Sequence, residues 1–184
     1  MPLLPSTTEQ QRWLALARAS ILQHWHPDEH GPEALEWGER LLNLFVTLHD
    51  EQGQLRGCIG TTDNTRQPLA ELLPHLARQA AFEDPRFSPL SEAQLNRCRI
   101  SLTLLGDPTP VAAKSPVELC QKLDPELGLI LSYQGRRALF LPAVWQQLPE
   151  RSAFLAALLR KGGWHQWLPG MQAWQFPATE FEEN

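Results

Sequence analysis

The chain has 184 residues, of which 42% are hydrophobic and 20% are charged, and its formal net charge at pH 7 is -5. This size and composition are typical of one soluble globular domain that folds without disulfide bonds or bound metal ions. Proteins that bind nucleic-acid phosphates carry an excess of lysine and arginine, so the acidic balance disfavours nucleic acid as a partner.

The chain shows no sign of export or membrane insertion. No cationic start is followed by an apolar core, and no apolar run reaches about 18 residues. We therefore expect a cytoplasmic protein with no membrane partner. The three cysteines, Cys58, Cys98 and Cys120, include no C-x-x-C pair, which argues against a disulfide framework and a zinc knuckle.

Residues 6–25 predict an amphipathic helix at the start of the chain. Ser6 and Glu9 have the spacing of a capping box, and apolar residues then recur at helical intervals. Residues 43–60 predict a β-hairpin that turns near Gly53. The segment of residues 67–87 predicts a second helix that ends within FEDPRF, and Pro74 either kinks or divides it, because proline has no N–H to donate inside a helix.

The strand predicted at residues 97–105 alternates apolar and polar side chains, a pattern typical of a half-buried strand. After it we expect a short helix at 115–123, a hairpin at 127–142 turning at Gln134 and Gly135, a helix at 151–161 and a strand at 171–176. Strands joined by short turns must be antiparallel. The sequence therefore predicts an α+β fold, with a mainly antiparallel sheet flanked by helices, as a single domain over residues 1–184.

The segment LRGCIG, in the second strand of the first hairpin, contains the strongest candidate site. Alternation along a strand predicts that Arg56, Cys58 and Gly60 share one face and that Leu55, Gly57 and Ile59 share the other. A guanidinium beside the thiol would favour the thiolate, and the glycines would let a ligand approach the sulfur. In the alternative interpretation, Cys58 is a small buried side chain and the glycines mark a bulge or close packing.

No histidine within this motif could serve as a base for the thiol. His49 ends the preceding strand, and the strand register decides which face it shares. The segment FEDPRFSP after the second helix supplies Asp84 and Arg86, which are weak candidates for substrate binding. The alternative for this segment is a helix stop with a local ion pair and an anchoring Phe87.

Two other patterns predict no cofactor. The segment HWHPDEH contains His24, His26, Asp28 and His30, which are residue types that bind transition metals, but their spacing matches no structural zinc signature. We favour a solvated loop and predict no metal site. Neither type of glycine-rich phosphate loop occurs, so the sequence identifies no cofactor.

Several segments, in the same order along the chain, resemble the AMMECR-type domain family. They are FVTL, LRGCIGT, AAFEDPRFSPL, RISLTLL, GRRALFLPAVWQQLP and the closing pattern FL..L..KGGW....W......F. The resemblance extends from about residue 10 to the C-terminus. KGGW departs from the family, whose members tend to read K-A-G-L there.

The resemblance implies an intracellular α+β domain with a smaller lobe packed beside it, whose boundary stays open. It also implies partners, since prokaryotic relatives of the AmmeMemoRadiSam system are encoded near a Memo-like protein and a radical S-adenosylmethionine protein. The family's LRGCIG motif marks a candidate active or binding site, which here is the segment Leu55, Arg56, Gly57, Cys58, Ile59 and Gly60. The resemblance itself implies no particular reaction.

Two functions follow as hypotheses. In the first, the protein is an enzyme or enzyme subunit in which Cys58 acts covalently or binds substrate, Arg56 stabilises the thiolate or binds an anion, and Gly57 and Gly60 give access. In the second, the motif is structural and the protein is a noncatalytic adaptor for the Memo-like and radical-enzyme partners.

Overall fold

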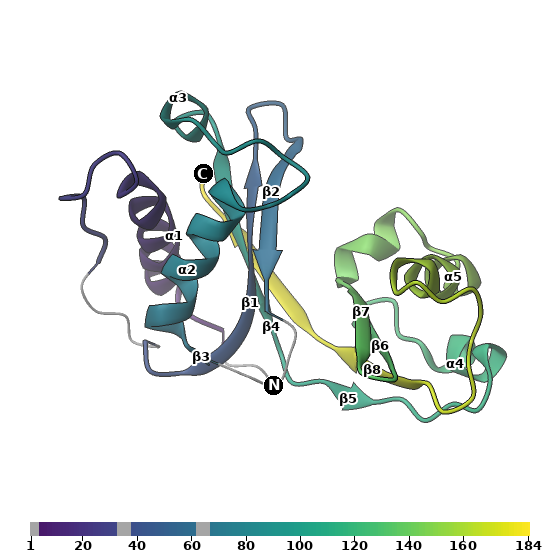
Figure 1. Cartoon of the computed structure of the whole chain (residues 1–184). Helices are drawn as coiled ribbons and strands as arrows, with labels where there is room; N and C mark the ends of the chain where they lie inside the picture. Colours follow the sequence, from purple (N-terminus) through teal and green to yellow (C-terminus); the bar gives the residue numbers. More distant parts are fainter. Residues whose placement is uncertain (1–3, 33–37, 62–66) are drawn as a thin grey trace. The chain divides into compact units, whose positions relative to one another are not determined.

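The computed structural model describes residues 4–32, 38–61 and 67–184, and these residues form two compact units (Figure 1). The first unit contains the described residues up to Leu105 together with Thr179–Asn184, and the second is Gly106–Ala178. The lobe boundary that the sequence does not reveal therefore falls after Leu105 and after Ala178.

The first unit is built on an antiparallel sheet. In the described part of the chain its strand order is β2 (Leu55–Gly60), β1 (Leu41–His49), β4 (Arg99–Leu105) and β9 (Ala178–Glu182), and β3 (Gln67–Pro68) also pairs with β1. The predicted hairpin is confirmed, because β1 and β2 are antiparallel neighbours. Its turn contains a glycine at a φ of 76°, where a side chain would be strained.

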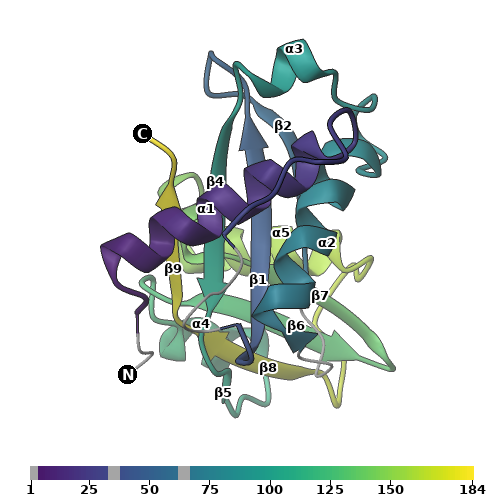
Figure 2. The same ribbon diagram turned by 90° about the vertical axis from the view of Figure 1, so that its left-hand side faces the viewer.

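Helices α1 (Thr7–Leu22) and α2 (Leu69–Phe82) cover one face of this sheet (Figure 2). The Ser6 side chain caps α1 by accepting a hydrogen bond from the backbone N–H of Glu9, as predicted. Pro74 lies inside α2, which is one helix and is not divided there. Apolar side chains on these helices pack against the buried alternate residues of β1 and β4, among them Leu44, Val46, Leu48, Ile100 and Leu102.

Strand β4 differs from the prediction of a half-buried strand, because its polar side chains are buried as well. Ser101 and Thr103 are only 1% and 4% exposed. Strand β4 lies inside the sheet, between β1 and β9, so larger side chains on a neighbouring strand can shield its small ones. Thr103, for example, is the cross-strand partner of Phe45.

The second unit has its own sheet and its own core. Its described strands have the order β5 (Thr109–Pro110), β8 (Gln172–Phe176), β6 (Gly128–Tyr133) and β7 (Arg136–Phe140). Helices α4 (Pro116–Lys122) and α5 (Arg151–Lys161) and the 3-10 helix η1 (Pro142–Gln146) complete it.

The two units together confirm the predicted α+β class. The second hairpin turns where the sequence predicts, at Gln134 and Gly135, whose φ angles are 48° and 77°. The pairings of β1 with β2 and β4, and of β6 with β7 and β8, are all antiparallel. None of the helices in the described ranges combines the length and the apolar character needed to cross a membrane.

Candidate functional site around Cys58

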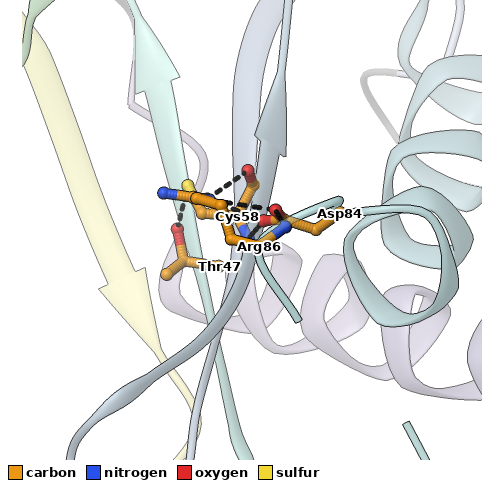
Figure 3. Close-up of polar contacts among 4 residues, drawn as sticks. All are labelled: Thr47, Cys58, Asp84 and Arg86. Carbon is orange, nitrogen blue, oxygen red and sulfur yellow. Dashed lines mark hydrogen bonds and ion pairs between the residues drawn. The ribbon is translucent and has the colours of Figure 1, made fainter. Parts of the chain in front are cut away.

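Cys58 lies on β2, the strand at one edge of the first sheet, and side chains from the loop after α2 hold its backbone (Figure 3). Its N–H donates to Oδ2 of Asp84 at 2.9 Å, and its carbonyl oxygen accepts from Nη2 of Arg86 at 3.2 Å. An edge strand presents unpaired N–H and C=O groups. The Asp84 and Arg86 side chains satisfy both groups at Cys58, as a further strand would.

The Asp84 carboxylate is buried and accepts hydrogen bonds from several donors. Besides the Cys58 N–H, it accepts from the backbone N–H of Arg86 at 3.1 Å, from Arg86 Nε at 2.9 Å and from Arg86 Nη2 at 2.6 Å. The hydrogen bonds from the Arg86 side chain, followed by those from the two backbone N–H groups, hold the pKa of Asp84 well below its ordinary value. Asp84 is therefore ionised at neutral pH and is too weakly basic to accept a proton from a thiol.

The thiol of Cys58 lies in a row of polar side chains that crosses three neighbouring strands. Cys58 pairs with Thr47 on β1, and Thr47 pairs with Ser101 on β4. The Sγ of Cys58 and the Oγ1 of Thr47 form a hydrogen bond at 3.2 Å, in which either atom can be the donor. The Ser101 Oγ is buried without a hydrogen-bond partner among the described residues.

The register also locates His49, whose face the sequence leaves open. In β1 the residues Leu44, Val46 and Leu48 are buried under the helices, so alternation puts Thr47 and His49 together on the other face. His49 therefore shares the face of the sheet on which the Cys58 thiol meets Thr47. Its cross-strand partners are Leu55 and Arg99. His49 therefore lies two residues along β1 from Thr47 and outside the row that contains Cys58.

Arg56 does not fit the regular alternation that places it beside Cys58. Leu48 pairs with Gly57 and the next residue of β1 pairs with Leu55, so the register shifts at Arg56. Such a bulge redirects a side chain. The Arg56 guanidinium donates to the carbonyl oxygen of Ser88 at 2.9 Å and lies over the Phe87 ring.

The charge of Arg56 acts on Cys98. Arg56 and Cys98 both line a cavity of about 190 Å³, together with Asp50, Glu51, Gln94 and Arg97. Burial raises the pKa of the Cys98 thiol, and the positive charge of Arg56 opposes that effect. The guanidinium that binds Cys58 belongs to Arg86.

The two glycines of the motif make close contacts that leave no room for a side chain. A Cβ on Gly57 would overlap the carbonyl oxygen of Ala80 in α2, and a Cβ on Gly60 would overlap the ring of Phe45. Close packing, the alternative that the sequence leaves open, explains both residues. A direct contact of either glycine with substrate stays a prediction.

The histidine-rich segment after α1 makes ordinary packing and surface contacts. The His24 ring packs against the Phe82 ring, with centroids 4.5 Å apart. His26 Nε2 lies 2.7 Å from Oε1 of Glu92, which raises the pKa of His26. Within the described ranges, the His, Cys, Asp and Glu side chains form no group of three or more that could hold a metal ion.

Two members of the Cys58 row, Thr47 and Ser101, are not candidates at the level of sequence. Both are small hydroxyl residues on predicted strands, and their positions become informative only when the register is known. The alternating polar face of residues 97–105 contains Ser101, but sequence alone does not show that it lies beside Thr47.

The fold and this site define an α+β protein in which the LRGCIG strand and the DPRF loop form one hydrogen-bonded structure. The model of the AMMECR1 family matches residues 14–181, and the chain belongs to that family. A protein of Thermotoga maritima is 35% identical over 158 residues, covering 85% of each chain. A protein of Methanosarcina mazei is 33% identical over 164 residues, covering 86% of this chain and 80% of the relative.

A solved structure has the same fold. The crystal structure of the uncharacterized protein PH0010 from Pyrococcus horikoshii is similar with a TM-score of 0.82 at 26% sequence identity. The match covers 96% of this chain and 92% of that one.

Proposed function

We propose that the chain is a cytoplasmic enzyme or enzyme subunit that binds its substrate at Cys58. As protein A of an AmmeMemoRadiSam system, it would act with a Memo-like protein and a radical S-adenosylmethionine protein. The observation that carries the proposal is the clamp on the Cys58 backbone, in which Asp84 accepts from its N–H and Arg86 donates to its carbonyl. The clamp holds the backbone of Cys58, a partly exposed residue, in one position at the sheet edge.

The exposure of the cysteines supports a role for Cys58 beyond packing. Free cysteine is among the most buried residue types, and Cys98, at 6% exposure, fits that description. Cys58 is only partly buried, although it belongs to the same unit. A partly exposed cysteine is better placed to contact a substrate than a buried one.

The electrostatic surroundings of Cys58 point the same way. The hydrogen bond to Asp84 is the main reason that the pKa of Arg86 is raised, and the charge of the Cys58 thiolate adds to the increase. The attraction between the Arg86 guanidinium and the Cys58 thiolate stabilises the charged form of both groups. The Arg86 guanidinium therefore favours the thiolate of Cys58, which is the form that binds or attacks a substrate.

A second candidate function is a noncatalytic adaptor, and the hydrogen bonds of the site favour it. The thiol bonds to a hydroxyl at Thr47, and Asp84 is held as a carboxylate by its donors. Neither group is suited to remove a proton from the thiol. In this case the clamp would shape the sheet edge for a partner protein.

Reconstitution with the two partners tests the enzyme proposal. The chain, the Memo-like protein and the radical protein are incubated with S-adenosylmethionine and a small-molecule extract, and mass spectrometry follows the products. We expect a product with the wild type that Cys58→Ala abolishes. The control Cys120→Ala alters another partly buried cysteine in the second unit and should leave the product unchanged.

The same variants separate the two functions. Full product formation by Cys58→Ala would contradict the enzyme proposal. If Cys58→Ala keeps the product and still co-purifies with the partners, the adaptor function is supported. Absence of any complex with either partner protein would count against the adaptor.

A further inference from the structure

One nitrogen of the Arg86 guanidinium, Nη1, takes no part in the clamp on Cys58. Nε and Nη2 donate to Asp84, and Nη2 also donates to the Cys58 carbonyl. Among the described residues, Nη1 has no hydrogen-bond partner, and the Arg86 side chain is 54% exposed. In Figure 3 the guanidinium extends across Cys58 on the side of the sulfur and Thr47.

Asp84 makes this nitrogen a preorganised donor. Its two carboxylate oxygens bind Nε and Nη2 together, which fixes the plane of the guanidinium and hence the direction of the N–H bonds on Nη1. A donor that is already fixed loses little conformational entropy when it binds a ligand. The Asp84 side chain is 2% exposed, so its own charge faces the protein interior.

Ser101 supplies a second, independent indication of a ligand. Its Oγ is buried and has no hydrogen-bond partner among the described residues, and such groups are rare because a buried polar group without a partner destabilises the fold. The residue lies on the same cross-strand row as Thr47 and Cys58. The Ser101 side chain is 1% exposed, so a bound molecule would reach this hydroxyl by displacing the neighbouring side chains that cover it, and a polar group of that molecule would then satisfy it.

The spacing of the strands limits the size of that molecule. Cys58 and Ser101 are two strands apart in the sheet, which corresponds to about 9–10 Å at the usual strand spacing. A single phosphate or acetate ion cannot reach both ends of the row. The ligand must be an extended small molecule.

From these contacts we propose that Arg86 Nη1 binds the oxyanion of an extended small-molecule substrate beside the Cys58 thiol, and that Ser101 binds a polar group at the other end. The oxyanion is a carboxylate or a phosphate. This inference rests on the proposed function, since it names the substrate class for the Cys58 site. It also assigns anion binding to Arg86, in place of Arg56.

Alkylation of Cys58 by two small reagents tests the anion site. Iodoacetate is an anion and iodoacetamide is a neutral molecule of similar size, and both react with the thiolate. The ratio of their rates at Cys58 therefore cancels any change in the thiolate fraction and reports attraction of the anion. Peptide mass spectrometry measures the rate at Cys58 separately from the other two cysteines.

We expect Arg86→Gln to lower the ratio of the iodoacetate rate to the iodoacetamide rate about fivefold. Arg56→Gln should leave the ratio unchanged, because the Arg56 guanidinium is bound to Ser88. An unchanged ratio in Arg86→Gln, an equal loss in Arg56→Gln, or complete resistance of Cys58 to both reagents would overturn the proposal.

A protection experiment needs no variant of Arg86 and so does not depend on how that variant folds. Acetate, inorganic phosphate and chloride are compared at equal ionic strength for their ability to slow the reaction of wild-type Cys58 with iodoacetamide. Slowing by acetate identifies a carboxylate site, and slowing by phosphate identifies a phosphate site. If neither anion slows the reaction more than chloride, the proposal is wrong.

Adipate, a dicarboxylate long enough to extend toward Ser101, tests the second end. It should protect Cys58 better than acetate, and Ser101→Ala should remove that advantage without changing protection by acetate. Equal protection by adipate and acetate in the wild type would overturn the role of Ser101. Suppose that the ratio of the iodoacetate rate to the iodoacetamide rate is the same in Arg86→Gln and in the wild type, while Cys58→Ala still abolishes product formation. The anion site is then wrong and the proposed function stands.

Discussion

The carboxylate of Asp84 accepts the backbone N–H of Cys58 at 2.9 Å, and this bond joins two motifs that lie 26 positions apart. Arg86, two residues after Asp84, completes the clamp by donating to the Cys58 carbonyl. The LRGCIG and DPRF motifs therefore occur together for a structural reason. The loop after α2 satisfies the edge of β2 at the residue that carries the thiol.

Removing the Asp84 charge should destabilise the first unit. We expect Asp84→Asn to lower the free energy of unfolding by about 2 kcal/mol, because a buried acceptor of charge-assisted hydrogen bonds is lost. Glu83→Gln is a matched control at the neighbouring exposed carboxylate and should change stability by less than about 0.5 kcal/mol. Urea unfolding measures both, and equal effects would contradict the structural role of Asp84.

The lowered pKa of Asp84 predicts how the free energy of unfolding depends on pH. The folded-state pKa of Asp84 is lowered, so its stabilisation is complete above the unfolded-state value of about 4 and declines as the pH falls below it. The difference in stability between wild type and Asp84→Asn should be constant near neutral pH and shrink in acid. Urea midpoints at several pH values test this, and a difference that grows in acid would contradict it.

The two glycines of the motif should differ in their tolerance of alanine. A Cβ at position 57 would overlap the backbone carbonyl oxygen of Ala80 in α2, whereas a Cβ at position 60 would overlap mainly the Phe45 ring and would lie 2.7 Å from the backbone carbonyl oxygen of Leu44. The overlap with backbone is less severe at position 60, and a side chain yields more easily than a helix backbone. We expect Gly57→Ala to destabilise by about 3 kcal/mol and Gly60→Ala by about 2 kcal/mol. Thermal or urea unfolding measures which of the two substitutions destabilises more. A larger loss of stability in Gly60→Ala than in Gly57→Ala would contradict the assigned packing of these two glycines.

Gly162 and Trp164, in the KGGW segment, should behave as a coupled pair. A Cβ on Gly162 would overlap the ring of Trp164, which is 5% exposed. We expect Gly162→Ala to cost about 2 kcal/mol in the wild type and much less in Trp164→Leu, since leucine removes the overlapping ring. A double-mutant cycle by urea unfolding measures the coupling, and additive effects would contradict it.

Local sequence patterns predict most of the elements. The α1 cap at Ser6 and the turns at Gly53 and Gly135 depend on residues close together in the chain, and all three are confirmed. The helix stop and the ion pair between Asp84 and Arg86 are likewise local, and the structure contains both. Strand β9 is missed, because it pairs in the first sheet with β4, from which the whole second unit separates it in the chain.

The site shows the limit of such patterns most clearly at the two arginines. Alternation places Arg56 beside Cys58, but the shift in strand register at Arg56 interrupts that alternation, and its guanidinium binds Ser88. Bulges depend on pairing between strands and on the loop that packs over them, so no local pattern reveals this one.

By itself, the sequence determined the α+β class, the first hairpin and the choice of Cys58 as the residue in question, because helix periodicity, turn residues and motif spacing are local properties. The tertiary structure alone decided which guanidinium holds Cys58 and which hydroxyl groups share its row. Those contacts come from strand register and from the loop after α2, and both are set by packing between segments distant in the chain.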